Sequence, residues 1–293
     1  AQEGQVWYNT TSTVLKGFGL SAPGGTWASG GNLNSGRKTG GSFGASQSAI
    51  LDVGGEPGPG AYTEEYDGTS WSERADLTTG AQNFGGSCGT TAAGLMFSGY
   101  RGGHSVLNEE WDGTSWTEVG NVLTARTQAG GLGTETAAIF AGGHAPGNSA
   151  LSETWDGTSW TEGNNINTAR YGMTSAGIAT AGIISGGNAS PAYTEEYDGT
   201  SWSEKADLNT GRNQMGGSTN APSTSTMVAA GGPPNQVLTE LWDGTSWTEV
   251  ADMATARNQV MGGGVETGGL ISGGNTSNTS TEEWTAATAI KTF

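Results

Sequence analysis

Short runs of apolar residues alternate with polar turns along almost the whole chain. Residues 212–250 show the order: a run of small residues at 212–218, an apolar run at 225–232 that ends in Gly-Gly, an alternating run at 237–242, and a last run that starts at Trp247. Runs of this length with turn signals between them are typical of short antiparallel strands. The pattern therefore predicts a unit of four strands.

The unit returns along the sequence with a fixed marker, Asp-Gly-Thr-Ser-Trp. The five copies lie at residues 67–71, 112–116, 156–160, 198–202 and 243–247. Successive tryptophans are 45, 44, 42 and 45 residues apart, and a period of this size indicates a repeat architecture. Asp-Gly is a hairpin-turn dipeptide because glycine adopts positive φ without a Cβ clash. We therefore interpret the marker as the turn between the third and fourth strands, and not as a functional motif.

Glycine and aromatic residues occur on different strands of the unit, as expected when several sheets are arranged around a common axis. The first strand of nearly every unit contains Gly-Gly, and the third and fourth strands carry aromatic residues. Innermost strands crowd around an axis and leave little room for side chains, whereas large rings fill the space between diverging sheets.

Arginine, then Gly-Gly, then an aromatic residue, then Trp is the plan of the kelch repeat, which the chain resembles over residues 27–284. The resemblance implies an all-β fold, a β-propeller with one four-stranded antiparallel blade per repeat. The phrase Thr-Glu-Glu-Tyr-Asp-Gly-Thr-Ser-Trp, at residues 63–71 and 194–202, is also similar to kelch-like propellers encoded by marine bacteriophages. The opening residues 3–11 resemble lead-in segments of phage tail-fibre and other virion proteins. These resemblances imply a virion or extracellular location.

The repeats predict six blades and a specific closure of the ring. The first-to-third-strand sets begin near residues 37, 81, 126, 170, 212 and 257. The sixth set ends at Trp284 without a following Asp-Gly-Thr-Ser-Trp, while the strand around Trp27 has no set of its own. We expect this N-terminal strand to complete the sixth blade, which removes free sheet edges. Residues 290–293 are an alternative for that place, or an addition outside it.

We expect two parts, an N-terminal adapter at residues 1–22 and the propeller at residues 23–293. Within the adapter, residues 4–16 predict a hairpin, because two apolar-rich runs flank a polar turn.

Composition alone would suggest disorder, since aliphatic residues are few and the net charge is −17. The 11 Trp and 7 Tyr overturn that inference, because they recur at repeat positions and each ring buries a large area. The pI of about 4.3 argues against nucleic acid or an anionic membrane as a partner. A single cysteine, Cys88, excludes an internal disulfide framework, and no apolar run is long enough to span a membrane.

Arginines at one repeat position are the first candidate site. They are Arg37, Arg126, Arg170, Arg212 and Arg257, and Ala81 interrupts the series. One hypothesis is a pocket for a carboxylate, a phosphate or an acidic sugar at one mouth of the channel. The alternative, which we favour, is that each arginine bonds loop carbonyls or an acidic residue and fixes the blades.

Loops that follow each Gly-Gly are the second candidate. They differ from unit to unit and should lie on the same face as the arginines. Their candidate ligand-binding residues are Tyr62, Tyr100, His104, His144 and Tyr193. The differences between the loop sequences have two equally good explanations. The loops recognise a ligand, or their sequences are under no constraint.

No residue set suggests catalysis, so we expect no enzyme activity, no cofactor and no metal. Two histidines without clustered cysteines do not form a metal site, and Cys88 in a glycine-rich strand is expected to be a buried, inert thiol. The paired glutamates of the third strands are expected to be solvated; they are Glu64-Glu65, Glu109-Glu110, Glu195-Glu196 and Glu282-Glu283.

The sequence thus favours a non-enzymatic propeller that recognises a host-surface glycan or protein. A structural decoration, filament or fibre subunit is the alternative, with other virion or fibre subunits as partners, and a homo-oligomer is compatible with either. A glycan-active enzyme is the third hypothesis. It would need clustered acids in the channel mouth, where Glu56 stands alone.

Overall fold

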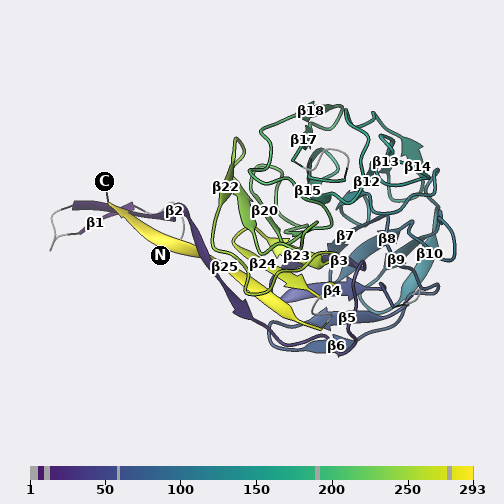
Figure 1. The fold of residues 1–293 in the computed structure, drawn as a ribbon, viewed down its shortest axis with the longest axis horizontal. Helices are drawn as coiled ribbons and strands as arrows, with labels where there is room; N and C mark the ends of the chain where they lie inside the picture. Colours follow the sequence, from purple (N-terminus) through teal and green to yellow (C-terminus); the bar gives the residue numbers. More distant parts are fainter. Residues whose placement is uncertain (1–5, 10–13, 58–59, 189–191, 276–278, 293) are drawn as a thin grey trace.

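The computed structural model describes residues 6–9, 14–57, 60–188, 192–275 and 279–292. Within these ranges all regular elements are strands, and they form six sheets arranged in a ring (Figure 1). The predicted six-bladed β-propeller of four-stranded antiparallel blades is confirmed. No helix capable of crossing a membrane occurs among these residues.

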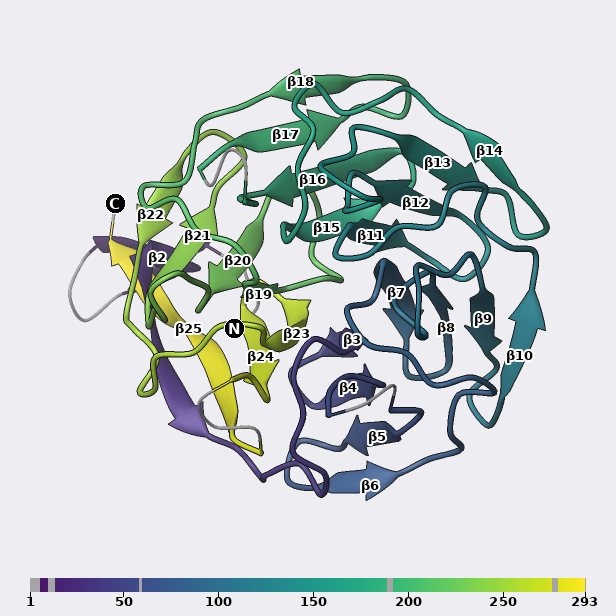
Figure 2. The same ribbon diagram turned by 45° about the vertical axis from the view of Figure 1, so that its right-hand side comes forward.

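Each of the first five blades uses four consecutive strands, running from the axis to the rim (Figure 2). Blade 1 consists of β3 (Gly41–Ser46), β4 (Ala49–Val53), β5 (Thr63–Tyr66) and β6 (Trp71–Glu73). Blade 2 consists of β7 (Gly86–Thr90), β8 (Ala93–Phe97), β9 (Asn108–Trp111) and β10 (Trp116–Val119). Blade 3 consists of β11 (Gly130–Gly133), β12 (Ala138–Ala141), β13 (Ser152–Trp155) and β14 (Trp160–Glu162). Blade 4 consists of β15 (Thr174–Ile178), β16 (Ala181–Ser185), β17 (Thr194–Tyr197) and β18 (Trp202–Glu204). Blade 5 consists of β19 (Gly216–Gly217), β20 (Thr226–Ala229), β21 (Thr239–Trp242) and β22 (Trp247–Glu249).

Strands from both ends of the chain build the sixth blade. β23 (Met261–Val265) and β24 (Gly268–Ser272) are followed by β25 (Thr281–Thr292), and β2 (Val14–Ser29) pairs on the outer side of β25. Trp27 lies opposite Trp284, with ring centroids 5.6 Å apart. The predicted closure through the strand around Trp27 is therefore confirmed.

A three-stranded ribbon extends from this blade (Figure 1). β1 (Val6–Asn9) pairs with the start of β2, as the predicted hairpin requires, although its turn at residues 10–13 lies outside the described residues. β2 continues through residue 22 into the propeller, with a pairing irregularity between Leu20 and Gly25. Residues 288–292 pair with residues 16–20, so the C-terminal residues continue the third strand and do not compete with Trp27; Phe293 is not among the described residues.

The Asp-Gly-Thr-Ser turn has the same geometry in all five copies. In the first copy Asp67 Oδ1 accepts hydrogen bonds from the backbone N–H groups of Thr69 and Ser70, both at 2.8 Å, and Gly68 has φ 92°. These N–H groups hold the pKa of Asp67 below its usual value, because they stabilise the carboxylate. The turn places Tyr66 opposite Trp71, with ring centroids 5.0 Å apart. The repeated marker is therefore scaffold, as interpreted.

Outer-strand tryptophans join each blade to the one before it. Trp116 Nε1 of blade 2 donates to Thr63 Oγ1 of blade 1 at 3.0 Å. The same 3.0 Å bond to a third-strand threonine is made by Trp247 to Thr194, by Trp27 to Thr239 and by Trp71 to Thr281. Blades 3 and 4 break the pattern, because Asn108 and Ser152 replace the threonine and the indole nitrogens of Trp160 and Trp202 are buried without a partner among the described residues.

This irregularity predicts a stabilising substitution. In Ser152→Thr the β-branched side chain should hold its hydroxyl toward Trp202, as Thr63, Thr194, Thr239 and Thr281 do toward their tryptophans. The free energy of unfolding should rise by about 1 kcal/mol, since that is the usual net value of a hydrogen bond to a buried donor. Urea unfolding followed by tryptophan fluorescence measures the change. Ser185→Thr, a buried serine on β16, is the control. An equal effect of both substitutions on the free energy of unfolding would contradict a specific hydrogen bond between residue 152 and Trp202.

Candidate functional site

The five repeat arginines are buried inside the blades. Each forms an ion pair with a glutamate on the third strand of its own blade: Arg37–Glu64 at 3.2 Å, Arg126–Glu153 at 2.8 Å, Arg170–Glu195, Arg212–Glu240 at 2.5 Å and Arg257–Glu282 at 2.9 Å. Their residue exposures are 0–2%. Arg126 also donates to the carbonyl oxygen of Gly142, at the start of the following loop. This arrangement favours the structural alternative, and anion binding by the arginines stays a prediction.

The glutamates of these pairs also accept hydrogen bonds from backbone N–H groups of the segment that leads into each blade. Glu153 accepts the backbone N–H groups of Leu123 and Thr124, at 2.7 and 3.1 Å, and its counterparts bind the equivalent connections. The expectation of solvated glutamate pairs was therefore wrong for the first member of each pair. Glu64, Glu109, Glu195 and Glu282 are buried, and only the second members are partly exposed.

Blade 2 replaces its missing arginine from elsewhere in the chain. Ala81 occupies the repeat position, and Arg101 from the loop after β8 reaches Glu109 at 3.2 Å. The Arg101 side chain is only 6% exposed. All six blades thus contain an arginine–glutamate pair.

The loops and the arginine-flanking residues lie at one end of the blades, which we call the mouth face; the Asp-Gly-Thr-Ser turns lie at the other end, the turn face. On the mouth face the residue after each repeat arginine, or after Ala81 in blade 2, is hydrogen-bonded to a residue at the start of the Gly-Gly loop. The pairs are Lys38–Glu56, Gln82–Tyr100, Thr127–His144, Tyr171–Asn188, Asn213–Gly232 and Asn258–Asn275. The backbone arrangement is shared, whereas the side chains differ in every blade.

Blades 2 to 4 contribute a continuous row of rings, the aromatic arc, formed by Tyr100, His104, His144 and Tyr171. The imidazoles of His104 and His144 stack with centroids 5.5 Å apart and planes at 25°. Tyr100 meets His104 edge-on at 6.3 Å, and His144 meets Tyr171 edge-on at 5.0 Å. Tyr100 is 37% exposed and His104 is exposed. The arc brings together three of the predicted residues and adds Tyr171.

Tyr62 and Tyr193 lie apart from the arc. They are 52% and 41% exposed and belong to the loops of blades 1 and 4. Among the described residues neither makes a ring contact with the arc. Residues 58–59, 189–191 and 276–278 of the predicted loops are outside the described ranges.

At the centre of the mouth face is a small cavity of about 130 Å³ to which all six blades contribute. Its rim, the polar cup, consists of Thr39, Asn83, Gln128, Gly172, Gln214 and Gln259, and its floor includes Phe84, Met173, Met215 and Val260. Every rim residue has positive φ, between 47° and 71°. For residues other than glycine this conformation costs about 1–2 kcal/mol each, least for asparagine. Sequence reasoning missed the cup, although its members share one repeat position, two residues after the arginine.

Backbone hydrogen bonds link the rim residues from blade to blade. Thr39 N donates to Gln259 O and Gln259 N to Gln214 O, both at 3.0 Å. Gln214 N donates to Gly172 O and Gly172 N to Gln128 O, both at 2.7 Å. These backbone hydrogen bonds fix the Cα positions of the rim residues, from which the side chains extend.

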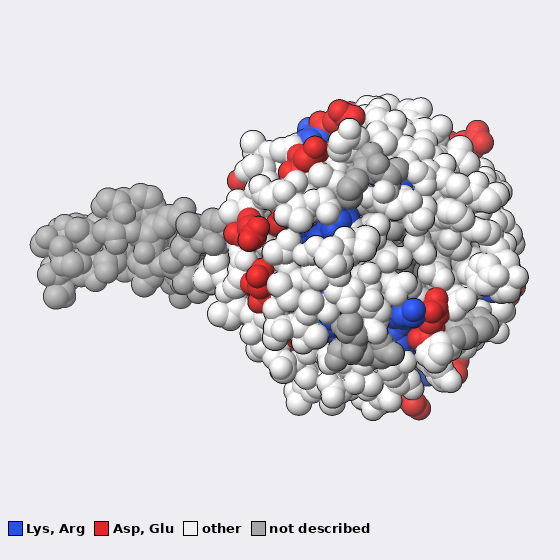
Figure 3. All heavy atoms as spheres, in the orientation of Figure 1, with Lys and Arg blue, Asp and Glu red and all other residues white. Residues whose placement is uncertain are grey.

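One pair of opposite charges contacts the rim of the cup, because Lys38 Nζ donates to Gln259 Oε1 and Asn83 Nδ2 donates to Glu56 Oε1, both at 3.3 Å. No rim or floor residue is charged, and Lys38 at the mouth is paired with Glu56 at 3.2 Å. Most atoms on the propeller face seen in Figure 3 belong to uncharged residues. The single acid noted in the sequence, Glu56, is thus neutralised rather than presented as part of an acidic cluster.

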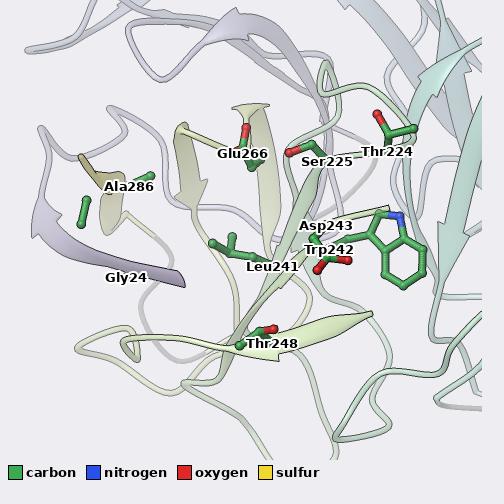
Figure 4. A pocket seen from close by; sticks show the side chains of 10 residues that line it. Gly24, Thr224, Ser225, Leu241, Trp242, Asp243, Thr248, Glu266 and Ala286 are labelled. Atoms are coloured by element: carbon green, nitrogen blue, oxygen red, sulfur yellow. The ribbon is translucent and has the colours of Figure 1, made fainter. Parts of the chain in front are cut away.

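A larger cavity of about 340 Å³ lies toward the turn face between blades 5 and 6. Leu241 and Thr248 of blade 5 and Gly24 and Ala286 of blade 6 contribute to its walls (Figure 4). It contains none of the predicted site residues, and its two carboxylates, Asp243 and Glu266, have no histidine or cysteine beside them in the lining.

The described residues contain no group of three or more His, Cys, Asp or Glu that could hold a metal ion. Cys88 is a free, buried cysteine, and burial raises the pKa of its thiol. A raised thiol pKa disfavours the thiolate that nucleophilic chemistry needs.

Asp52 is a buried carboxyl at the seam between blades 1 and 6, where it accepts a hydrogen bond from Ser272. Burial raises its pKa from 3.8 to about 6, and the charge of Arg37 offsets only part of this effect.

The raised pKa predicts a pH-dependent stability. Because the folded pKa of Asp52 exceeds its unfolded value, the contribution is fully present below pH 3.8 and is lost as the pH rises through about 6. The free energy of unfolding of the wild type, minus that of Asp52→Asn, should therefore fall by about 2 kcal/mol between pH 4 and 7. Urea unfolding across this range measures the difference. A flat or rising difference would contradict the assignment.

No family model matches the chain, and no curated protein is significantly similar to it.

Proposed function

We propose that this protein is a non-enzymatic recognition propeller that binds a glycan or a protein of a host surface through its mouth face. The observation that carries the proposal is the contrast between a repeated scaffold and six mouth pairs of different chemistry. Binding residues commonly lie on loops held by a rigid framework. The aromatic arc, in which Tyr100 and His104 are exposed, adds rings with apolar faces and polar edges, a combination that is favoured in recognition sites.

The biological setting is part of the proposal. The resemblance of the repeats to kelch units of marine bacteriophages, and of residues 3–11 to phage lead-in segments, supports a virion-associated or extracellular protein, for example in a tail fibre. The acidic composition supports solubility in salty surroundings, where charges are screened.

The second candidate is a structural subunit, and the ribbon of β1, β2 and β25 favours it. Among the described residues the two outer edges of the projecting ribbon have no paired strand, and such edges are suited to pairing with a neighbouring subunit. Deleting residues 1–17 would remove β1 and leave Trp27 in place. Lost assembly with retained surface binding would assign docking to the ribbon and recognition to the mouth face.

A glycan array together with adsorption to host cells tests recognition itself. The wild-type chain and the deletion of residues 1–17 should bind the same surface ligand with equal affinity. Absence of binding by the wild type in both assays would overturn the recognition proposal in favour of the structural subunit.

A further inference from the structure

Residues of the polar cup adopt a backbone conformation that is unfavourable for residues with a side chain, and this recurs around the ring. Five of its six members carry a side chain in the left-handed region, with φ of 56° at Thr39, 47° at Asn83, 54° at Gln128, 54° at Gln214 and 57° at Gln259. Glycine at position 172 adopts the same conformation, so the frame itself needs no side chain. Strained residues that a glycine could replace point to a role for their side chains.

The retained side chains share one chemistry. All five are uncharged and able to form hydrogen bonds, and no rim position carries an acid, a base or an apolar group. Five amide or hydroxyl groups around a cavity of about 130 Å³ can donate and accept hydrogen bonds in several directions at once.

Part of this hydrogen-bonding capacity is unused within the protein. Gln128 Nε2 donates to Asn83 Oδ1 at 2.9 Å, and Lys38 Nζ donates to Gln259 Oε1 at 3.3 Å. Gln128 Oε1 and Thr39 Oγ1, however, are buried and have no partner among the described residues. A buried polar atom without a partner is costly, so a rotation that turns these two side chains into the cavity, where a ligand donates hydrogen bonds to them, is favoured.

The floor and the size of the cup restrict that ligand further. Phe84, Met173, Met215 and Val260 give the cavity an apolar base beneath the polar rim. The cavity is smaller than sites that enclose a whole drug-sized ligand, so a single ring, or part of one, fits it. An apolar face combined with hydroxyl groups around the edge is the chemistry of a sugar ring.

We propose that the polar cup is a subsite for one uncharged sugar unit, and that the aromatic arc beside it contacts the next unit of the same chain. On binding, the side chains of Gln128 and Thr39 rotate so that their oxygens accept hydrogen bonds from hydroxyl groups of the sugar. The amides of Gln214 and Gln259 bind its remaining hydroxyls, and its apolar face lies toward Phe84 and the methionines. A neutral sugar is favoured over an acidic one because no rim residue is charged and Glu56 neutralises Lys38, the cation that contacts Gln259. This inference rests on the proposed recognition function and names its ligand class.

Saturation-transfer NMR with the full chain tests the subsite. The probes are the methyl glycosides of glucose, galactose, mannose and N-acetylglucosamine, with glucuronic acid and sialic acid as charged comparisons. At least one neutral probe should show transfer and the acids should show none. In Gln214→Gly and Gln259→Gly the apparent affinity should fall about tenfold or more, the size expected for loss of a directed contact. The unfolding midpoint in urea should be unchanged or higher, because glycine relieves the strained conformation.

Ile178→Ala, an exposed position on the turn face, is the control and should keep the wild-type affinity. Transfer that survives both glutamine variants, or transfer from the acids alone, would overturn the neutral-sugar subsite and leave recognition by the mouth face standing. Lower stability of both glycine variants would show that the glutamines serve the fold, and would also overturn it. Absence of transfer from every probe would overturn the subsite, while cell adsorption decides the recognition proposal separately.

Discussion

Arg212→Ala should lower the free energy of unfolding by about 3–5 kcal/mol, because breaking a buried ion pair leaves its partner charged and unpaired. Arg212 and Glu240 are each about 1% exposed and lie 2.5 Å apart. Arg212 also donates to the carbonyl oxygens of Ala230 and Thr210, which would lose a partner. Urea unfolding followed by tryptophan fluorescence measures the loss.

The control for this variant is an exposed pair from the same protein. Arg74 and Glu65 lie 2.6 Å apart, but their side chains are 47% and 25% exposed. Arg74→Ala should cost about 0–1 kcal/mol, since solvent screens such pairs. Similar losses in Arg74→Ala and Arg212→Ala would contradict the structural role of the repeat arginines. Because Arg212→Ala is expected to disturb the fold, binding experiments should use exposed residues of the mouth face.

Deleting residues 1–29 should abolish cooperative folding or lower the free energy of unfolding by more than about 5 kcal/mol. The deletion removes the outer strand of the sixth blade, the Trp27–Trp284 contact and the bond from Trp27 to Thr239. Trp27 is partly buried, so its loss accounts for part of the about 3–5 kcal/mol that a fully buried aromatic side chain contributes, and the lost strand pairing adds the rest. The deletion also exposes the edge of β25, which favours aggregation.

Deletion of residues 1–17 is the matched control, because it removes β1 but retains residues 25–29, which pair with residues 282–286. Its midpoint in urea should stay close to that of the wild type. Thermal unfolding with equal midpoints for both deletions would show that the N-terminal strand does not close the ring.

Local chemistry and repeat counting made the fold predictable. The Asp-Gly turn sets the register of the third and fourth strands, and a sixth blade without its own fourth strand leaves Trp27 as the natural partner of Trp284. The continuation of β25 along residues 16–20 was not predictable, since it depends on how two chain ends meet.

The candidate site was less accessible to sequence reasoning. The partner of Arg126 is Glu153, and a repeated Glu at this third-strand position was visible but was interpreted as a surface charge. Substitution of Arg101 for the arginine missing at Ala81 depends on a loop conformation. The His104–His144 stack joins two blades, and positive φ at Gln128 or Gln214 leaves no mark in residue type, because glutamine has no preference for that conformation.

The central claim is that recognition takes place on the mouth face. Its most direct test compares the affinity of labelled protein for host cells between the double variant Tyr100→Ala/Tyr171→Ala and Ile178→Ala, whose side chain is 55% exposed on the turn face. We predict a loss of about tenfold or more for the double variant, since aromatic contacts dominate many binding sites, and no change for Ile178→Ala. Equal affinities of the two variants, or a loss confined to Ile178→Ala, would contradict the account.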